Sequence, residues 1–221
     1  MEFLLHFHVK SNQRDKLVRL LESYSGITSI ITSRRTDDLL DNILSDTDAD
    51  PNYYVINRSS SSWQSVECNS FKKHHCLGRM ISEDMGAVFV QTLYCSLGEY
   101  TYFLVYDKGK MIREIESTNE SMIPRINQGI ALPFESKRKG GKRINNIRMF
   151  DLDSIADYCL QMGIDISNLW NEHRSIVLRG RKHDNVLYHI ERQKLRTLWN
   201  IERYVRKITG VMTKRKSAKD N

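Results

Sequence analysis

The stretch from Gly86 to Glu116 constrains the fold more than any other part of this sequence. It contains three segments rich in aromatic and β-branched residues, AVFVQTLYC, YTYFLVY and KMIREIE, joined by two short connections. Gly98 and Gly109 are placed to supply the positive φ angles that short hairpin loops need. The pattern therefore predicts a three-stranded antiparallel meander, in which Asp107-Lys108-Gly109 forms a three-residue loop.

Further strands and helices are predicted before the meander. Apolar residues at helical spacing predict a helix that is capped by Ser11 and ended by Gly26, and two more helices at residues 37–44 and 71–84. Segments with alternating or β-branched residues predict strands at residues 2–9, 27–32, 53–58 and 62–68. Together these elements predict an α+β fold with a mostly antiparallel sheet packed by helices.

The chain changes in character after residue 136. Residues 136–143 read SKRKGGKR, a basic segment with two glycines that is typical of a flexible loop between domains. We therefore predict an α+β sheet domain at residues 1–136 and a basic, mainly helical region at residues 137–221. In the second region we expect a helix capped by Asp151 or Asp153 and closed by Gly163, a short strand at 175–178, and a long final helix at 186–212.

The charge of the chain is divided unevenly. The net charge is +7, yet residues 1–136 hold 14 Lys and Arg against 18 Asp and Glu. Residues 181–221 hold 12 Lys and Arg against 4 Asp and Glu. Because such an asymmetry concerns partners rather than fold, it predicts a negatively charged partner for the C-terminal part.

The final helix is predicted to be amphipathic. At 100° per residue its apolar side chains fall within an arc of about 80°, which we expect to face a core. The opposite side combines cations with two aromatic residues, and the loop near residue 140 adds more cations. The candidate binding residues are Tyr188, Arg192, Arg196, Trp199, Arg203, Arg206 and Lys207 on the helix, and Lys137, Arg138, Lys139, Lys142 and Arg143 in the loop.

This basic face has three interpretations. It is a solvated surface on which Trp199 is covered by another part of the chain, or it binds nucleic acid, with arginines on phosphates and an aromatic ring stacked on a base. The third interpretation is an acidic protein partner, anchored by Trp and Arg side chains. A membrane surface fits less well, because the apolar side of the helix is needed for a core.

The sequence contains no recognised catalytic or cofactor-binding motif. It lacks the phosphate-binding P-loop, the nucleophile elbow, the H-E-x-x-H zinc motif and the dinucleotide fingerprint. Asp107, Glu114 and Glu116 are expected to be a turn residue and two solvent-facing strand residues. His6 and His8 share one face of a strand, but no further metal ligand is placed beside them. We therefore expect neither a metal nor a cofactor.

The remaining histidines and the cysteines are expected to be structural. His74 and His75 open a helix and point to diverging faces, and the four cysteines form no C-x-x-C pair, so we expect buried reduced thiols. No apolar run approaches the length of a membrane span, and the N-terminus lacks the pattern of a secretory signal. We therefore expect a cytoplasmic protein.

The segment from Trp63 to Glu135 resembles a loose class of small bacterial α+β proteins. The features appear in the order WQSVE, LGRMISEDMG, AVFVQTLYC, YTYFLVYDKGKMIREIE and QGIALPFE. Many proteins of that class are identified as immunity proteins near polymorphic toxins. The resemblance implies a non-enzymatic protein that binds another protein.

Three functions follow from these observations. The first is a non-enzymatic interaction module that binds a protein partner, with a role in immunity or defence. The second is a nucleic-acid-binding accessory protein that uses the basic final helix. The third is a nuclease-like enzyme whose site the sequence does not identify.

Overall fold

The computed structural model describes most of the first 180 residues of this 221-residue chain. The described residues are 3–33, 51–57, 62–96, 98–118, 124–135, 143–144, 147–148, 150–166 and 175–180. The predicted helices at 37–44 and 186–212 lie outside them. So do residues 136–142 of the predicted basic loop and residues 181–221, which hold most of the excess positive charge of the predicted C-terminal region.

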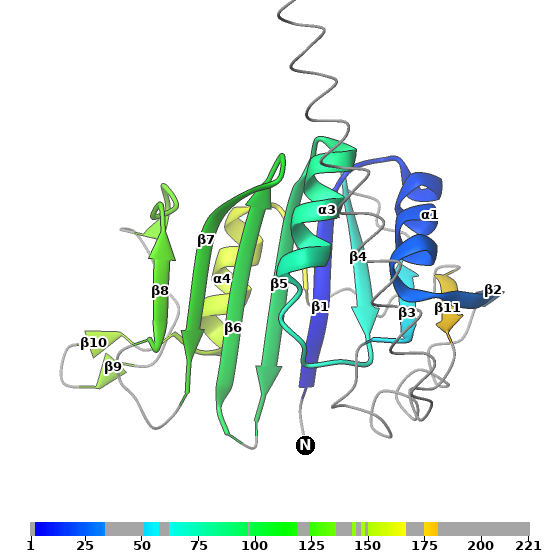
Figure 1. Ribbon diagram of the computed structural model, residues 1–221. Helices are drawn as coiled ribbons and strands as arrows, with labels where there is room; N and C mark the ends of the chain where they lie inside the picture. Colours follow the sequence, from blue (N-terminus) through cyan, green and yellow to red (C-terminus); the bar gives the residue numbers. More distant parts are fainter. Residues whose placement is uncertain are drawn as a thin grey trace, which may run out of the picture.

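One large sheet forms the centre of the fold (Figure 1). It has nine strands in the order β2-β11-β3-β4-β1-β5-β6-β7-β8, and each neighbouring pair is antiparallel. The strands are β1 (Phe3–Lys10), β2 (Ile27–Ser33), β3 (Tyr53–Asn57), β4 (Trp63–Cys68), β5 (Val88–Cys95), β6 (Tyr100–Asp107), β7 (Lys110–Ser117), β8 (Ile126–Gly129) and β11 (Ser175–Gly180). A separate small hairpin pairs β9 (Arg143–Ile144) with β10 (Ile147–Arg148). The prediction of an α+β fold with an antiparallel sheet is confirmed.

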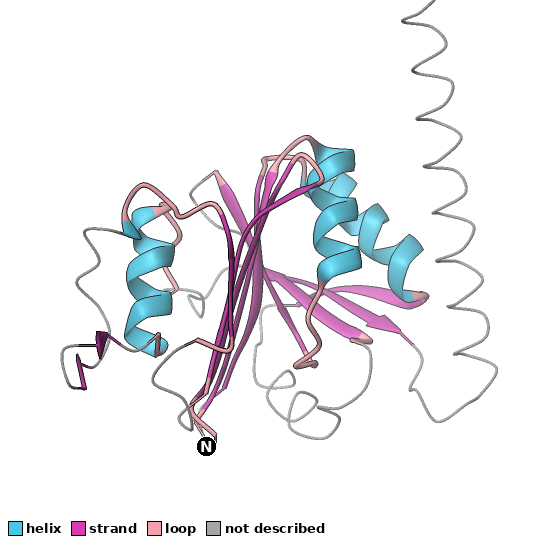
Figure 2. Ribbon diagram, turned by 60° about the vertical axis from the view of Figure 1, so that its left-hand side comes forward, coloured by secondary structure: helices cyan, strands magenta, loops and turns pink. Residues whose placement is uncertain are grey.

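Helices cover both faces of this sheet. Helices α1 (Arg14–Ser25) and α3 (His75–Met85) lie on one face, and α4 (Leu152–Gln161) lies on the other (Figure 2). Elements on both sides of residue 136 therefore contribute to one layered structure, since α4 packs on the sheet and β11 is one of its strands. No helix in the described part of the chain is long and apolar enough to cross a membrane.

The ends of the helices confirm some predicted caps and correct others. Asp151 caps α4 and forms a reciprocal capping box with Ser154, and Gly26 ends α1 in a left-handed conformation, as predicted. Ser11 is not the cap of α1, because the N-cap is Gln13; the Ser11 hydroxyl instead accepts the Gln13 N–H at 3.0 Å, ahead of the helix. Helix α3 begins at residue 75, four residues later than predicted.

Two apolar cores lie on the two faces of the sheet. The core under α4 is built around the Tyr158 ring, whose centroid lies 5.1–5.3 Å from those of Phe103, Phe134 and Phe150 in edge-to-face geometry. The core under α1 and α3 contains the buried side chains Phe7, Leu17, Leu21, Tyr54, Leu77, Ile81 and Phe89.

The predicted meander is confirmed, with two corrections in its loops. Strands β6 and β7 are joined by the two residues Lys108 and Gly109, both with positive φ, so the loop is shorter than predicted. In the connection between β5 and β6 the positive φ belongs to Glu99 and not to Gly98. The prediction for Gly109 holds, and the prediction for Gly98 is wrong.

Strand β7 contains a bulge at Ile112. Tyr106 pairs with Met111, but Val105 pairs with Arg113, so Ile112 has no partner residue across the ladder. An extra residue of this kind reverses which side chains beyond it point to each face of the sheet. Because of the bulge, Glu114 and Glu116 lie on the same face as Tyr102, opposite α4.

Candidate functional site

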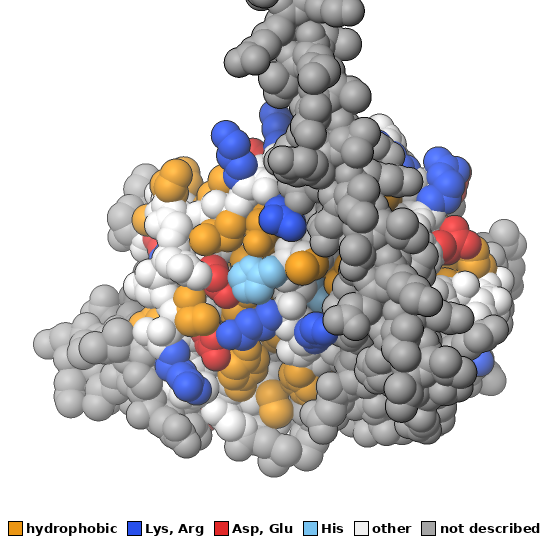
Figure 3. Space-filling view, in the orientation of Figure 1, with side chains coloured by type: hydrophobic (Ala, Val, Ile, Leu, Met, Phe, Trp, Pro, Cys, Tyr) orange, Lys and Arg blue, Asp and Glu red, His pale blue; other side chains and the backbone are white. Residues whose placement is uncertain are grey.

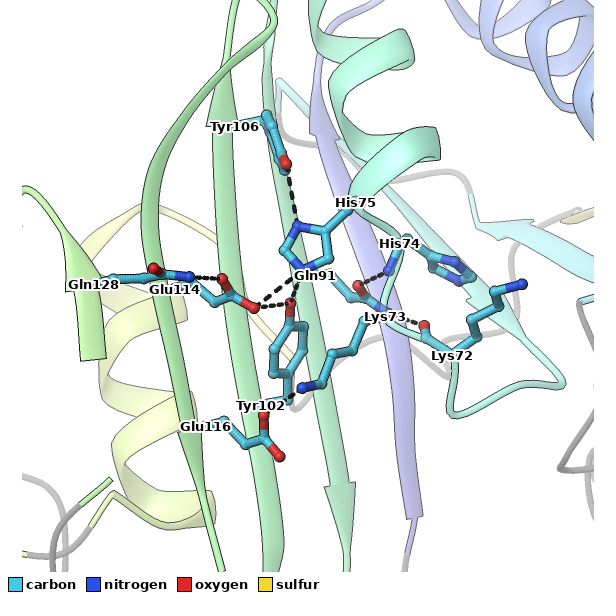
Figure 4. Close-up of polar contacts among 10 residues, drawn as sticks. All are labelled: Lys72, Lys73, His74, His75, Gln91, Tyr102, Tyr106, Glu114, Glu116 and Gln128. Carbon is cyan, nitrogen blue, oxygen red and sulfur yellow. Dashed lines mark hydrogen bonds and ion pairs between the residues drawn. The ribbon is translucent and has the colours of Figure 1, made fainter. Parts of the chain in front are cut away.

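On the face that carries α1 and α3, helix α3 packs against β5 and part of β6, and the described helices leave the rest of β6, most of β7 and β8 uncovered (Figure 1). Polar and aromatic side chains from these strands and from the start of α3 meet there (Figure 4). Figure 3 shows histidine, carboxylate and cationic side chains near the middle of this face, with hydrophobic side chains around them. We call this group the His75 cluster; its members are Lys73, His75, Tyr102, Tyr106, Glu114, Glu116 and Gln128.

The Gln91 side chain holds the chain segment that leads into α3. Gln91 lies on β5 and is completely buried. Its Oε1 accepts the His74 N–H at 2.7 Å, and its Nε2 donates to the Lys72 carbonyl at 2.8 Å. These two bonds fix the backbone on both sides of Lys73 and so direct Lys73 and His75 toward the open strands (Figure 4).

Glu114 is the centre of the cluster. Only 3% of its side chain is exposed, and its carboxylate accepts two hydrogen bonds and makes an ion-pair contact with His75. The Tyr102 hydroxyl donates to Oε1 at 2.8 Å, and Gln128 Nε2 donates to Oε2 at 2.5 Å. His75 Nε2 lies 3.0 Å from Oε1 and 3.2 Å from the Tyr102 oxygen. A buried carboxylate with this many donors keeps its position and its charge.

The second carboxylate of the cluster is paired with a lysine. The Lys73 ammonium group forms an ion pair and hydrogen bond with Glu116 Oε2. The same ammonium group lies 5.1 Å from the centroid of the Tyr102 ring, in cation–π distance. Both formal charges at this end of the cluster are therefore partnered within the protein.

The cluster shifts the pKa values of its buried members in opposite directions. Burial alone raises the pKa of Glu114. The hydrogen bonds from Tyr102 and Gln128, together with the positive charges of His75 and Lys73, outweigh burial and bring the pKa below its usual value of 4.5. Burial, followed by the hydrogen bond to Glu114, raises the pKa of Tyr102. Glu114 is thus held as a carboxylate and Tyr102 as a neutral hydroxyl donor.

His75 is the most exposed ionisable ring of the cluster, but both of its nitrogens are engaged. Nδ1 lies 3.1 Å from the Tyr106 hydroxyl, while Nε2 is directed to Glu114 and Tyr102. The side chain is 42% exposed, so the ring presents its carbon edge and face to solvent. A general acid or base needs a nitrogen within reach of substrate. Both nitrogens of His75 are therefore held by groups of the protein itself in this structure.

The residues that the sequence predicted as a binding site are not brought together in the described structure. Arg143 is in β9, and only its backbone is described. The other predicted binding residues lie outside the described residues: Lys137, Arg138, Lys139, Lys142, Tyr188, Arg192, Arg196, Trp199, Arg203, Arg206 and Lys207. Their role in binding stays a prediction.

The two glutamates of β7 do not lie where they were predicted. Glu114 and Glu116 were expected to face solvent, and this prediction is wrong, since both residues are buried. One signal pointed to the cluster: Tyr100, Tyr102 and Tyr106 recur at even spacing on one strand and so share a face. That signal did not identify the opposing carboxylates, because the bulge at Ile112 sets the register.

A second polar group lies buried on the opposite face of the sheet. His6 and His8 share one face of β1, as predicted, with ring centroids 6.0 Å apart. His8 Nδ1 lies 2.9 Å from the Ser65 hydroxyl, and His6 Nε2 lies 3.5 Å from Glu67 Oε2. In the part of the chain that is described, no group of three or more His, Cys, Asp or Glu residues is placed to hold a metal ion.

The buried His8 is expected to make the fold sensitive to acid. Burial, and then the positive charge of His6, lower the pKa of His8 well below its usual value of 6.5. As the pH falls below 6.5, the unfolded chain binds a proton at residue 8 that the folded protein does not, so stability is lost on acidification. Each such proton costs up to about 1.4 kcal/mol per pH unit.

Chemical unfolding of the wild type and of His8→Gln between about pH 5 and pH 8 measures this contribution. The variant should show a flatter decline in unfolding free energy below 6.5. Leu160→Gln, which changes an exposed residue that does not titrate, is the control and should retain the wild-type decline. Equal slopes for the wild type and His8→Gln would contradict the assignment to His8.

The cysteines are free thiols, but not all of them are buried. Cys68 lies 3.6 Å from His74 Nε2 in the core, where burial raises the pKa of the thiol to about 12. It is therefore a packing residue and not a nucleophile. Cys159 is buried as predicted, whereas Cys76 is exposed, so the prediction of burial is wrong for Cys76.

The chain was compared with known protein families, with curated proteins and with solved structures, and none of the three comparisons finds a match.

Proposed function

We propose that this chain is a non-enzymatic module that binds a protein partner through the surface around the His75 cluster. The observation that carries the proposal is the internal pairing of that cluster on an uncovered part of the sheet. Glu116 is paired with Lys73, Glu114 accepts two hydrogen bonds and lies 3.0 Å from His75, and both nitrogens of His75 are hydrogen-bonded to tyrosines. The surface is therefore preorganised, which reduces the entropy lost on binding.

Apolar side chains beside the cluster support a protein as the partner. Met111 is exposed, while Tyr100 and Ile126 are partly buried. The strand register places all three on the same face as Glu116. Aromatic rings and Met around desolvated polar groups are typical of protein interfaces. The resemblance of residues 63–135 to immunity-type proteins further supports a partner from a toxin or defence system.

The test begins with a pull-down from the native host with the full chain as bait, at low and high salt and with nuclease present. The captured protein is then purified and titrated against two variants. Met111→Arg adds a long charged side chain beside the cluster without removing any of its hydrogen bonds. Leu160→Arg adds the same side chain on the opposite face, where Leu160 of α4 is exposed.

We expect Met111→Arg to weaken binding at least tenfold and Leu160→Arg to leave the dissociation constant unchanged. Equal loss in both variants would show that the partner does not use the His75 face. Turnover of nucleotide, nucleic acid or peptide by the purified protein, abolished by His75→Ala, would replace the proposal with an enzymatic function.

Nucleic-acid binding is a second candidate, favoured by the excess of cations in residues 181–221. It predicts that the logarithm of the binding constant for duplex DNA falls with the logarithm of salt concentration, with a slope of about 0.9 for each phosphate neutralised. Arg196→Glu combined with Arg203→Glu should reduce both affinity and slope in a fluorescence titration. Absence of binding at low salt would rule this candidate out.

A further inference from the structure

The hydrogen-bond partners of His75 determine where its ring protons lie (Figure 4). A neutral imidazole has one N–H donor and one acceptor nitrogen, and a carboxylate can only accept. His75 Nε2 lies 3.0 Å from Glu114 Oε1. An unprotonated Nε2 would direct its lone pair at that oxygen, so the proton of the neutral ring lies on Nε2.

The Tyr102 hydroxyl agrees with this tautomer. Its single proton is donated to Glu114 Oε1 at 2.8 Å, so it is not also available to His75 Nε2 at 3.2 Å. A protonated Nε2 instead donates toward both oxygens. Each contact at this end of the ring then joins one donor to one acceptor.

The other ring nitrogen faces Tyr106. With Nε2 protonated, Nδ1 is an acceptor, and the Tyr106 hydroxyl donates to it at 3.1 Å. Burial raises the pKa of Tyr106, against the effect of the Arg79 charge, so the hydroxyl keeps its proton. Within the described residues this hydroxyl has no second hydrogen-bond partner. Neutral His75 therefore holds the Tyr106 proton inside the protein.

A second proton can enter the ring only at Nδ1. The imidazolium has two donors and no acceptor, so Nδ1–H must then donate to the Tyr106 oxygen. Tyr106 keeps its own proton, which has to turn away from the ring. Glu114 supplies the opposite charge at 3.0 Å from Nε2. Both charge states of His75 are therefore fully hydrogen-bonded within the cluster.

We infer that His75 and Tyr106 form a proton switch on the face that carries the His75 cluster. Proton uptake from solvent at Nδ1 reverses the hydrogen bond between the two side chains and frees the hydroxyl proton of Tyr106. Histidine side chains change charge between about pH 5 and pH 8. Solvent reaches this one, because the side chain is 42% exposed. The protonated face has one more positive charge and one more free donor.

The surroundings of the ring identify His75 as the group that changes. The titratable and charged groups that face it within the described residues are Glu114 and Glu116 from β7, Tyr102 and Tyr106 from β6, Cys76 and Arg79 from α3, and Lys73. None of these is a histidine. The neighbouring His74 packs edge-on against Phe7 in the core instead. A change on this face over the histidine range is therefore assigned to His75.

The regulatory role of the switch rests on the proposed function, because it needs a partner on the same face. A partner carboxylate placed at Tyr106 gains a hydrogen-bond donor and a nearby opposite charge only in the protonated state. Binding should therefore tighten on acidification. The switch itself is a property of the free chain, so it is tested without the partner.

Nitrogen-15 NMR of the full chain, with two-bond correlations from the ring protons, measures the tautomer. The signals lost in His75→Gln identify His75. We expect the Nε2–H tautomer at about pH 8 and a doubly protonated ring at about pH 5. The Cζ resonance of Tyr106 should shift with the same midpoint, and His75→Gln should abolish that shift. Tyr102 donates to Glu114 in both states, so it is the internal control and should shift less.

Three results would overturn the switch: an Nδ1–H tautomer at the higher pH, a ring whose charge is constant over this range, or equal shifts of Tyr102 and Tyr106. Unfolding of His75→Gln as cooperative as that of the wild type shows that the variant is folded.

The protein captured in the pull-down is the probe for the regulatory role. We expect the wild type to bind it about fivefold or more tightly at about pH 6 than at about pH 8, and His75→Gln to lose most of this ratio. A switch seen by NMR with binding that is independent of pH would overturn the regulatory role. A partner insensitive to Met111→Arg would overturn the proposed function and leave the switch intact.

Discussion

Replacing Gly129 with alanine is expected to separate β8 from β7 and to lower the free energy of unfolding by about 2–5 kcal/mol. A Cβ atom at this position would lie 2.2 Å from the Ile112 carbonyl oxygen. The same oxygen accepts the Ile130 N–H at 2.8 Å, so relief of the overlap also breaks that bond. The φ angle of 91° adds backbone strain for any residue with a side chain.

Gly86→Ala is the control that separates these two effects. Gly86 also has a positive φ, but nothing lies within 4 Å of a Cβ built there. The substitution Gly86→Ala should therefore lower the free energy of unfolding by only about 1 kcal/mol, the penalty for a side chain in the left-handed region. Chemical unfolding gives both free energies, and hydrogen exchange of the β7 amides reports whether β8 has moved away. Equal losses in the two variants would contradict a steric origin.

Glu114→Ala is expected to cost about 2–4 kcal/mol of stability and to disorder the His75 ring. The substitution leaves the Tyr102 hydroxyl and the Gln128 amide without their acceptor in a largely buried site. Tyr102→Phe removes one of these donors at the same time. The double variant should therefore lose less than the sum of the two single variants, and a double-mutant cycle by chemical unfolding measures the difference. Strict additivity would contradict a coupled network.

The pH dependence of Glu114→Gln provides a second measurement on the same residue. Because the pKa of Glu114 is below 4.5 in the folded protein, its ionised form stabilises the fold above that pH. The stability gap between the wild type and Glu114→Gln should therefore shrink as the pH falls below 4.5. A gap that is constant with pH would show that the charge of Glu114 contributes nothing to the fold.

The sequence was sufficient for those elements that local chemistry determines. Alternating aromatic residues and a loop containing Gly109 predict β6 and β7 as a hairpin, and Asp151 with Ser154 carries the signature of a helix start. In these cases the residues that specify the element lie within a few positions of one another. Capping, turn formation and side-chain alternation all act over that range.

The register of β7 could not be predicted in the same way. A regular ladder from the turn would pair Glu114 with Phe103 and direct it toward α4. The bulge at Ile112 moves the pairing by one residue and places Glu114 opposite Leu104 instead. Nothing in the segment KMIREIE distinguishes the bulged from the regular strand, because Ile112 suits either face. The His75 cluster was missed for this reason.

The position of β11 was also beyond prediction. The segment at 175–178 was expected to be a short strand, and it extends to Gly180 in the structure. Its place between β2 and β3 depends on contacts with segments far away in the chain. Consecutive strands usually pair with each other, so the expectation for β2 and β3 is direct contact. The insertion of a later strand is a property of the whole sheet.

That insertion has a consequence for the synthesis of the protein. Among the described strands, β2 is joined to the rest of the sheet through β11, and the bond from Thr28 to the Arg179 carbonyl joins residues 151 positions apart. At ordinary translation rates a ribosome needs roughly 8–30 s to make that length of chain. During this interval the nascent chain holds β2 without its neighbour in the sheet. The second strand of the chain is therefore among the last to be incorporated, and the sheet cannot be completed in the order in which its strands leave the ribosome.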